Sequence, residues 1–282
     1  MNDGGGWRGE FPVDNASTRR SLYEGDLFHV GSTEASRALV SDVDTLLQEE
    51  LGAGDPRQAQ TRLGDEDFFA AIGRVRRRLF VDTHFHERVY AVAAACGFAR
   101  DEVAFDPVRL RVVSHGGHLN ERAVPIYYPH RDTWFSLSPS VIAWWIAMHD
   151  IEPTESFEIF PDWLARPVDN TSEGFDYDAW KRDARDLRIG WQNRDAGRVV
   201  HYSGTRGSFE PGRVVSLRAR RGDNVIFAGS HLHQTRDNNA GYTRYSLDFR
   251  MVHRGDHQQK IGVPNVDNRS RGSATEDYVG YR

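Results

Sequence analysis

Apolar residues recur at helical spacing through the N-terminal third of the chain. The first predicted helix follows the start signal Ser32-Thr33-Glu34 and ends at Gly52. A second apolar stripe covers residues 68–79, and a third helix is expected near residues 87–96. We therefore expect a helical support over residues 33–100.

The pattern changes after residue 106, where short apolar runs are separated by Gly, Pro, Asn and Asp. Alternation at period two is typical of half-buried strands, and continuous short runs are typical of buried ones. Many short strands with such turns favour a mainly β sandwich or barrel of the jelly-roll kind. We expect this core over residues 105–255, with strands at 108–113, 124–128, 141–148, 214–217, 225–227 and 245–252, after an earlier short strand within 22–30.

Two segments fall outside these patterns. Residues 1–20 are rich in glycine and polar residues, which predicts a flexible arm in front of a single domain, 21–282. Residues 160–212 mix aromatic with polar residues and include a short predicted helix at 177–187. A long insertion of this composition is typical of a lid or a substrate-binding wall.

Composition limits the function classes. The 282 residues are 39% hydrophobic, and no apolar run reaches the length of a membrane span or forms a signal peptide, so a cytoplasmic protein is expected. Cys96 is the only cysteine, which excludes a disulfide framework and favours a metal held by nitrogen and oxygen. The net charge of −5 gives no general attraction for nucleic acid. All but two of the 36 basic residues are arginine, so arginine abundance alone singles out no site.

The candidate chemistry lies in a short motif and two later residues. His130 is the only histidine followed two positions later by an acid, Asp132. His233 follows late in the chain, and Arg244 lies eleven residues beyond it. Two imidazoles and one carboxylate form the facial triad of non-heme iron(II) sites, and an arginine can grip a co-substrate carboxylate. If His130 and Asp132 lie on one strand, both point to the same face.

Two blocks of sequence around these residues resemble the iron(II)/2-oxoglutarate dioxygenases, specifically the phytanoyl-CoA-dioxygenase-like (PhyH) branch. The first block is 128–134 with the strand 141–148 that follows it. The second consists of 222–227, 232–238 and 243–250. The resemblance implies a double-stranded β-helix, which is a cupin-like jelly roll, and a requirement for Fe(II), 2-oxoglutarate and O2.

Position by position, the resemblance implies that His130, Asp132 and His233 ligate iron. It also implies that Arg244 binds the distal carboxylate of 2-oxoglutarate and that Ser246 adds a hydrogen bond. The chain departs from the family pattern at 160–166, where a frequent histidine motif is missing. That histidine is not an iron ligand, so the departure bears on substrate class.

Several assignments have rivals. His231 competes with His233, and the spacing to Arg244 favours His233; Arg250 competes with Arg244 and is otherwise expected in an ion pair. The partner of the 2-oxoglutarate C1 carboxylate stays open among Arg109, Arg111 and Asn120. Candidate substrate contacts are Trp134, His231 and Trp163.

The expected reaction is hydroxylation, or desaturation or oxidative ring closure, because the Asp132 carboxylate fills the position that halide occupies in halogenating relatives. We expect a small polar substrate, sugar-containing or amino-acid-derived, in natural-product tailoring such as antibiotic biosynthesis. The oligomeric state stays open between monomer and homodimer. The alternative is a cupin-like metal-binding isomerase or sensor, which would not need Arg244 or Ser246. A protein- or nucleic-acid-modifying oxygenase is a third and less favoured option.

Overall fold

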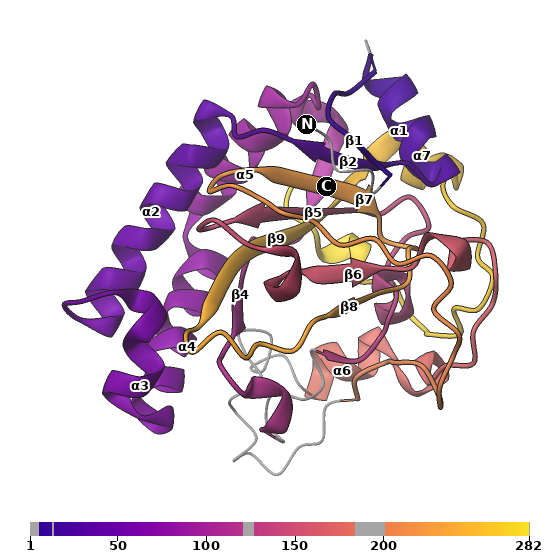
Figure 1. The fold of residues 1–282 in the computed structure, drawn as a ribbon. Helices are drawn as coiled ribbons and strands as arrows, with labels where there is room; N and C mark the ends of the chain where they lie inside the picture. Colours follow the sequence, from indigo (N-terminus) through magenta and orange to yellow (C-terminus); the bar gives the residue numbers. More distant parts are fainter. Residues whose placement is uncertain (1–5, 13, 121–126, 184–200, 282) are drawn as a thin grey trace.

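A mixed sheet of seven strands runs through the centre of the computed structural model, which describes residues 6–12, 14–120, 127–183 and 201–281 (Figure 1). The strand order is β1-β2-β7-β5-β9-β3, and β4 also pairs with β9. Only β1 and β2 run parallel; the other pairings are antiparallel. The strands are β1 Trp7–Arg8, β2 Leu27–Val30, β3 Val103–Phe105, β4 Arg109–Val113, β5 Ile142–Ala147, β7 Asn224–Ala228 and β9 Arg244–His253.

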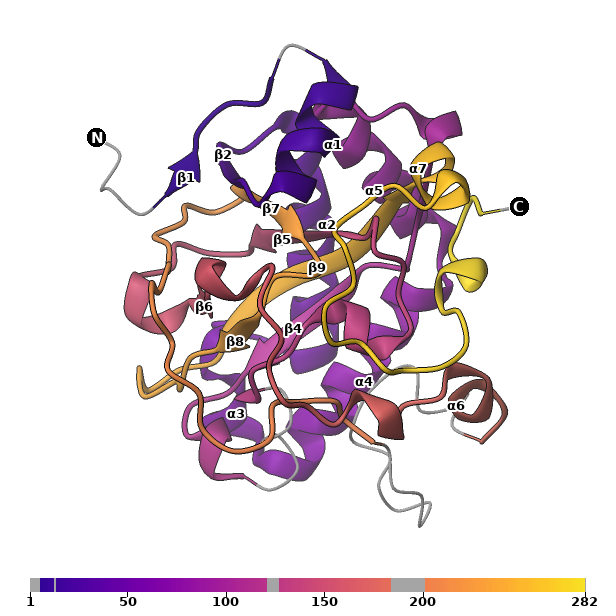
Figure 2. The same cartoon turned by 90° about the vertical axis from the view of Figure 1, so that its right-hand side faces the viewer.

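Helices from the N-terminal third cover one face of this sheet (Figures 1 and 2). The Thr33 hydroxyl caps the first turn of α2, and Gly52 ends the helix, as the sequence predicted. Within the described residues no helix is long and apolar enough to cross a membrane. The seven helices of this part of the chain are α1 Asn15–Glu24, α2 Glu34–Leu51, α3 Ala59–Leu63, α4 Asp65–Val81, α5 Thr83–Ala95, α6 Tyr177–Asp183 and α7 Arg254–Gln259.

Strand β9 separates the apolar core from the polar interior. Successive side chains of a strand point to opposite faces, and the sequence of β9 alternates apolar and polar residues. One set packs against the helices in the main core: Tyr245, Leu247, Phe249 and Met251. The alternate set is polar and equally buried, on the opposite face: Arg244, Ser246, Asp248 and Arg250.

A second, two-stranded sheet pairs β6 Phe157–Ile159 with β8 His233–Thr235. A second apolar cluster joins these strands to the inner face of the main sheet and includes Trp145 and Phe227. Ala143 lies opposite Arg250 and Ala147 lies opposite Ser246. These small side chains leave room for the long polar side chains that β9 sends inward.

Some expectations need correction. The described part of the expected arm 1–20 is not extended chain: it contains β1 and the start of α1, whose first turn Asp14 caps. The seven helices make the chain a mixed α and β protein rather than a mainly β one. The expected strand 214–217 is reduced to a bridge between Val215 and Ile159. Most of the expected strand 124–128 lies outside the described residues.

Candidate metal centre and co-substrate site

His130 and His233 face each other across an antiparallel bridge. Each backbone N–H donates to the other residue's carbonyl, over 2.9 and 3.0 Å, and the ring centroids lie 4.4 Å apart. The Nδ1 of His130 lies 2.8 Å from the Tyr128 carbonyl, and the Nδ1 of His233 lies 3.0 Å from the His231 carbonyl. Since a carbonyl only accepts, both Nδ1 atoms carry the proton, and both Nε2 atoms are left as metal-binding lone pairs.

Asp132 completes a group of three. One ligand atom from each of His130, Asp132 and His233 lies within 4.8 Å of the others, the kind of spacing that a single ion bridges. The expectation that His130 and Asp132 share a strand is wrong. His130 forms only the bridge to His233, and Asp132 opens a 3-10 helix, Asp132–Phe135. The turn of this helix, not strand alternation, brings the carboxylate beside the imidazoles.

The charges of the group suit a divalent cation. Burial and the neighbouring His233 lower the pKa of His130 to about 3, and burial lowers the pKa of His233 as well. Burial alone would raise the pKa of Asp132, but Arg250 and His233 outweigh it and hold that pKa well below its ordinary value. At neutral pH the site therefore presents two neutral imidazoles and one carboxylate.

Arg250 holds one oxygen of this carboxylate. Its Nη2 donates to Oδ1 of Asp132 over 2.8 Å, and its Nη1 donates to Oδ1 of Asp248 over 2.8 Å. The other oxygen, Oδ2 of Asp132, is buried without a protein partner. A buried carboxylate oxygen without a hydrogen bond is costly, which fits an oxygen that serves as a metal ligand. Arg250 thus forms buried ion pairs with Asp132 and Asp248, which is the structural role that the sequence offered as the alternative to binding a co-substrate.

A second set of unpartnered polar atoms lies further along the same face of β9. Arg244 is 1% exposed and donates from Nη1 to the Glu155 carbonyl over 3.1 Å, while its Nε has no partner. The buried Oγ of Ser246 and the buried hydroxyl of Tyr127 are also unpartnered. Burial and the nearby charge of Arg111 lower the pKa of Arg244 to about 10, so its guanidinium is charged at neutral pH. These donors suit the carboxylate of a small dianion.

The candidates for the C1 carboxylate differ in their surroundings. Arg111 lies opposite Ser246 in the register of β4 and β9, and its Nε and Nη2 both contact Oδ2 of Asp248 over 2.9 Å. Its charge also acts on His130 and His233, so it borders the metal group. Arg109 is largely exposed and pairs with Asp106. Asn120 directly follows the short helix 117–119, and its role stays a prediction.

The candidate substrate contacts lie in different environments. Trp134 is fully buried, packs with Phe160 and Leu232, and donates from Nε1 to Asp267 over 2.8 Å, so its role as a substrate contact stays a prediction. His231 is also fully buried and lies outside the ligand group. Trp163 is partly exposed, contacts Phe209 and donates to a backbone carbonyl, so it remains a candidate.

Sequence reasoning missed the partners of the ligands. It considered Arg250 only as a rival or an ion pair, and it named neither Asp248 nor Tyr127. The alternation along β9 carried a usable signal, because a strand whose whole inner face is polar and charged must line a functional chamber or exchange ion pairs.

Comparison with known proteins gives structural similarity only. No family model and no curated protein matches the chain. Solved structures similar to it include ThoJ, a non-heme monooxygenase, with TM-score 0.47 and 12% identity over 90% of this chain and 88% of that one. The epimerase SnoN, in complex with Fe3+, alpha ketoglutarate and nogalamycin RO, gives TM-score 0.45 and 15% identity over 92% and 96%. EvdO2 from Micromonospora carbonacea var. aurantiaca, complexed with 2-oxoglutarate, gives TM-score 0.46 and 12% identity over 90% of this chain and 98% of that one.

Proposed function

We propose that the protein is an iron(II)- and 2-oxoglutarate-dependent oxygenase. The observation that carries the proposal is the presence of two sets of unsatisfied polar atoms, one near each end of the polar face of β9. At one end are the Nε2 atoms of His130 and His233 and the unpartnered Oδ2 of Asp132. At the other are the unpartnered Nε of Arg244 and Oγ of Ser246. A metal satisfies the first set, and a co-substrate with a distal carboxylate satisfies the second.

The donor set fits iron(II) among the common metals. Two imidazoles and one carboxylate form a facial triad that leaves positions for other ligands, and the described residues offer no thiolate beside them. Bound iron(II) with 2-oxoglutarate and O2 supplies oxidative decarboxylation coupled to oxidation of a substrate C–H bond. Because Asp132 occupies the third ligand position, we propose hydroxylation, desaturation or ring closure and not halogenation.

The remaining residues bind, orient and exclude water. Arg244 and Ser246 hold the far carboxylate of 2-oxoglutarate, and Tyr127 extends this set of donors. Arg111 supplies positive charge for the C1 carboxylate, with Asn120 as the other candidate. The apolar side chains of Trp145 and Phe227 pack beside the metal group, where Phe227 contacts His233, and would limit the access of water, which strengthens charged contacts.

The finer parts of the proposal concern architecture and substrate. We assign the two facing sheets to a double-stranded β-helix, with residues 160–183 and 201–212 as a wall of the substrate site; the rest of the expected insertion 160–212 lies outside the described residues. The substrate is a small polar metabolite, sugar-containing or amino-acid-derived, oxidised in natural-product tailoring. The aromatic Trp163 beside Arg166 gives this wall a stacking face with polar neighbours. We propose a cytoplasmic monomer or homodimer.

Anaerobic titration of iron(II) and then 2-oxoglutarate into the purified protein tests the proposal. A weak visible charge-transfer band of the chelate is expected in the wild type. His233→Ala should lose metal and band together, whereas Arg244→Ala should keep metal affinity and lose the band. Metal binding without a band in the wild type would make the chain a metal-binding protein of another kind.

A further inference from the structure

The residue between the first two proposed ligands has a buried guanidinium. Arg131 is 1% exposed, although an unpaired charge is rarely tolerated at such depth. Its Nη1 donates to the Ser230 carbonyl, and its Nη2 donates to the carbonyls of Trp163 and Arg166 over 2.7 and 2.8 Å. Its Nε lies 3.1 Å from Oδ2 of Asp267, which supplies the compensating charge.

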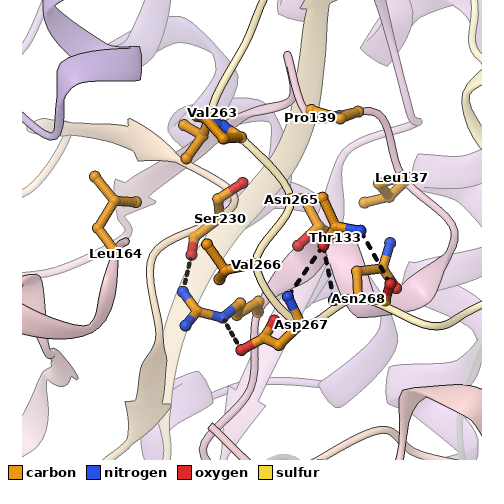
Figure 3. A pocket seen from close by; sticks show the side chains of 12 residues that line it. Thr133, Leu137, Pro139, Leu164, Ser230, Val263, Asn265, Val266, Asp267 and Asn268 are labelled. Atoms are coloured by element: carbon orange, nitrogen blue, oxygen red, sulfur yellow. Dashed lines mark hydrogen bonds and ion pairs between the residues drawn. The ribbon is translucent and has the colours of Figure 1, made fainter. Parts of the chain in front are cut away.

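Asp267 belongs to the C-terminal segment, far from Arg131 in the sequence. Its side chain is 5% exposed and accepts three hydrogen bonds. Besides Arg131, the donors are Nε1 of Trp134 over 2.8 Å and the backbone N–H of Val168 over 3.1 Å. The segment 263–268 borders a small hollow. Ser230 and Asp267 line it, and their bonds to the guanidinium of Arg131 are drawn as dashed lines (Figure 3).

These bonds connect the two segments that carry the metal ligands. Arg131 lies between His130 and Asp132, and the carbonyl that it binds belongs to Ser230, in the turn that precedes His233. On the other side of the guanidinium, Asp267 also holds Trp134 in the 3-10 helix that Asp132 opens. The Arg131–Asp267 pair therefore helps to fix the position of the segment with His130 and Asp132 relative to the segment with His233.

We propose that Arg131 and Asp267 form a positioning clamp through which the C-terminal segment sets the spacing of the metal ligands. The clamp touches neither metal nor co-substrate. The proposal rests on the metal site proposed above and adds that the metal affinity depends on an aspartate 34 residues after His233 in the chain. If the clamp only packed the core, its loss would lower stability and leave metal affinity unchanged.

Cobalt(II) titration of the metal-free protein, followed by its visible absorption bands, tests the clamp. Asp267→Asn keeps the size of the side chain and removes the charge that faces Arg131. Loss of a group that orients metal ligands typically weakens metal binding 10- to 100-fold, so we expect a fall of about 10-fold or more and weaker, shifted bands. Trp134→Phe removes one bond to Asp267 and should give a smaller loss in the same direction.

Asp277→Asn is the matched control. Asp277 is also an aspartate of the C-terminal segment, but it accepts hydrogen bonds from Tyr177 and Lys181, both in α6. We expect the cobalt(II) affinity of the Asp277→Asn variant to match that of the wild type even if the melting temperature of the variant falls. Equal cobalt(II) affinity in Asp267→Asn, Trp134→Phe and wild type would overturn the clamp and leave the oxygenase proposal standing. A wild-type protein that binds no cobalt(II), iron(II) or nickel(II) would overturn both.

Discussion

Nη2 of Arg250 lies 2.8 Å from Oδ1 of Asp132, while Oδ2 of the same carboxylate has no protein partner. A carboxylate has two equivalent oxygens, and the bond to Arg250 makes them different. Oδ1 is held by Arg250 of β9, and Oδ2 is left without a bond to the protein. Asp248 accepts a hydrogen bond from Arg250 and also from Arg111 of the neighbouring strand β4. The proposed ligand is thus oriented by the protein itself, an arrangement that would lower the cost of binding a metal.

Substitution of Arg250 is expected to weaken metal binding, and loss of its charge is expected to weaken the fold as well. In Arg250→Lys a single ammonium cannot bridge Asp132 and Asp248 in the same geometry, because it lacks the planar fork of arginine. We expect iron(II) or cobalt(II) affinity to fall about 10-fold or more. In Arg250→Met two buried carboxylates lose their countercharge, which should cost about 3–5 kcal/mol of stability. Titration calorimetry and thermal melts measure the two effects; unchanged metal affinity in Arg250→Lys would contradict this role.

Ser246→Ala is expected to separate co-substrate binding from stability. The Oγ of Ser246 is buried and has no partner in the protein, so its removal leaves no protein group unsatisfied. The melting temperature of the metal-free variant should equal or exceed that of the wild type. Loss of one hydrogen bond to the carboxylate should weaken 2-oxoglutarate binding by about 1 kcal/mol, or roughly fivefold. Anaerobic titration with unchanged iron(II) affinity as the internal control checks this, and unchanged 2-oxoglutarate affinity would exclude Ser246 from the site.

Gly229 lies close to Asp132, the proposed carboxylate ligand. This close contact is possible because Gly229 has no side chain. A Cβ at this position would lie 2.5 Å from Cγ1 of Val141 and 3.2 Å from Cβ of Asp132. Gly229→Ala should therefore displace Asp132, lower stability by about 1–3 kcal/mol and weaken metal binding. Gly73→Ala is the control, because nothing lies within 4 Å of its added Cβ in α4. That helix-interior change should raise stability by about 0.5–1 kcal/mol in a denaturant melt.

The metal-free protein is expected to lose stability as the pH falls below about 6.5. Burial lowers the pKa of the fully buried His231 to about 4, below its ordinary value of 6.5. The unfolded chain then binds a proton at a higher pH than the folded chain, so the stabilising contribution is complete above pH 6.5 and is lost as the pH falls toward 4. By pH 5 the loss from this residue is about 2 kcal/mol. Melts at pH 7.5, 6 and 5 check the slope, and His231→Gln should flatten it; an identical slope in that variant would contradict the assignment.

The helices α2, α4 and α5 and the strands β4, β5, β7 and β9 could be predicted because their causes are local. Thr33 and Gly52 mark the ends of α2, and the alternation of Tyr245, Leu247 and Phe249 marks the apolar face of β9. The strand β1, within the expected arm 1–20, could not be predicted, because it gains its hydrogen bonds only by pairing with β2. A two-residue strand has no pattern of its own.

The sequence by itself determined which residue types were available for a metal: one His-x-Asp motif, one later histidine and an arginine beyond it. It also determined that no thiolate cluster could compete. These are matters of composition and spacing, which folding does not change.

Only the tertiary structure decided how those residues meet. His130 and His233 are joined by backbone bonds between segments that are distant in the chain, and Asp132 is turned by a 3-10 helix and held by Arg250. Buried charges must find partners, and the partners that the fold brings close can come from any part of the chain. For this reason Arg250 and Asp267, which no local pattern connects with His130, become part of the same site.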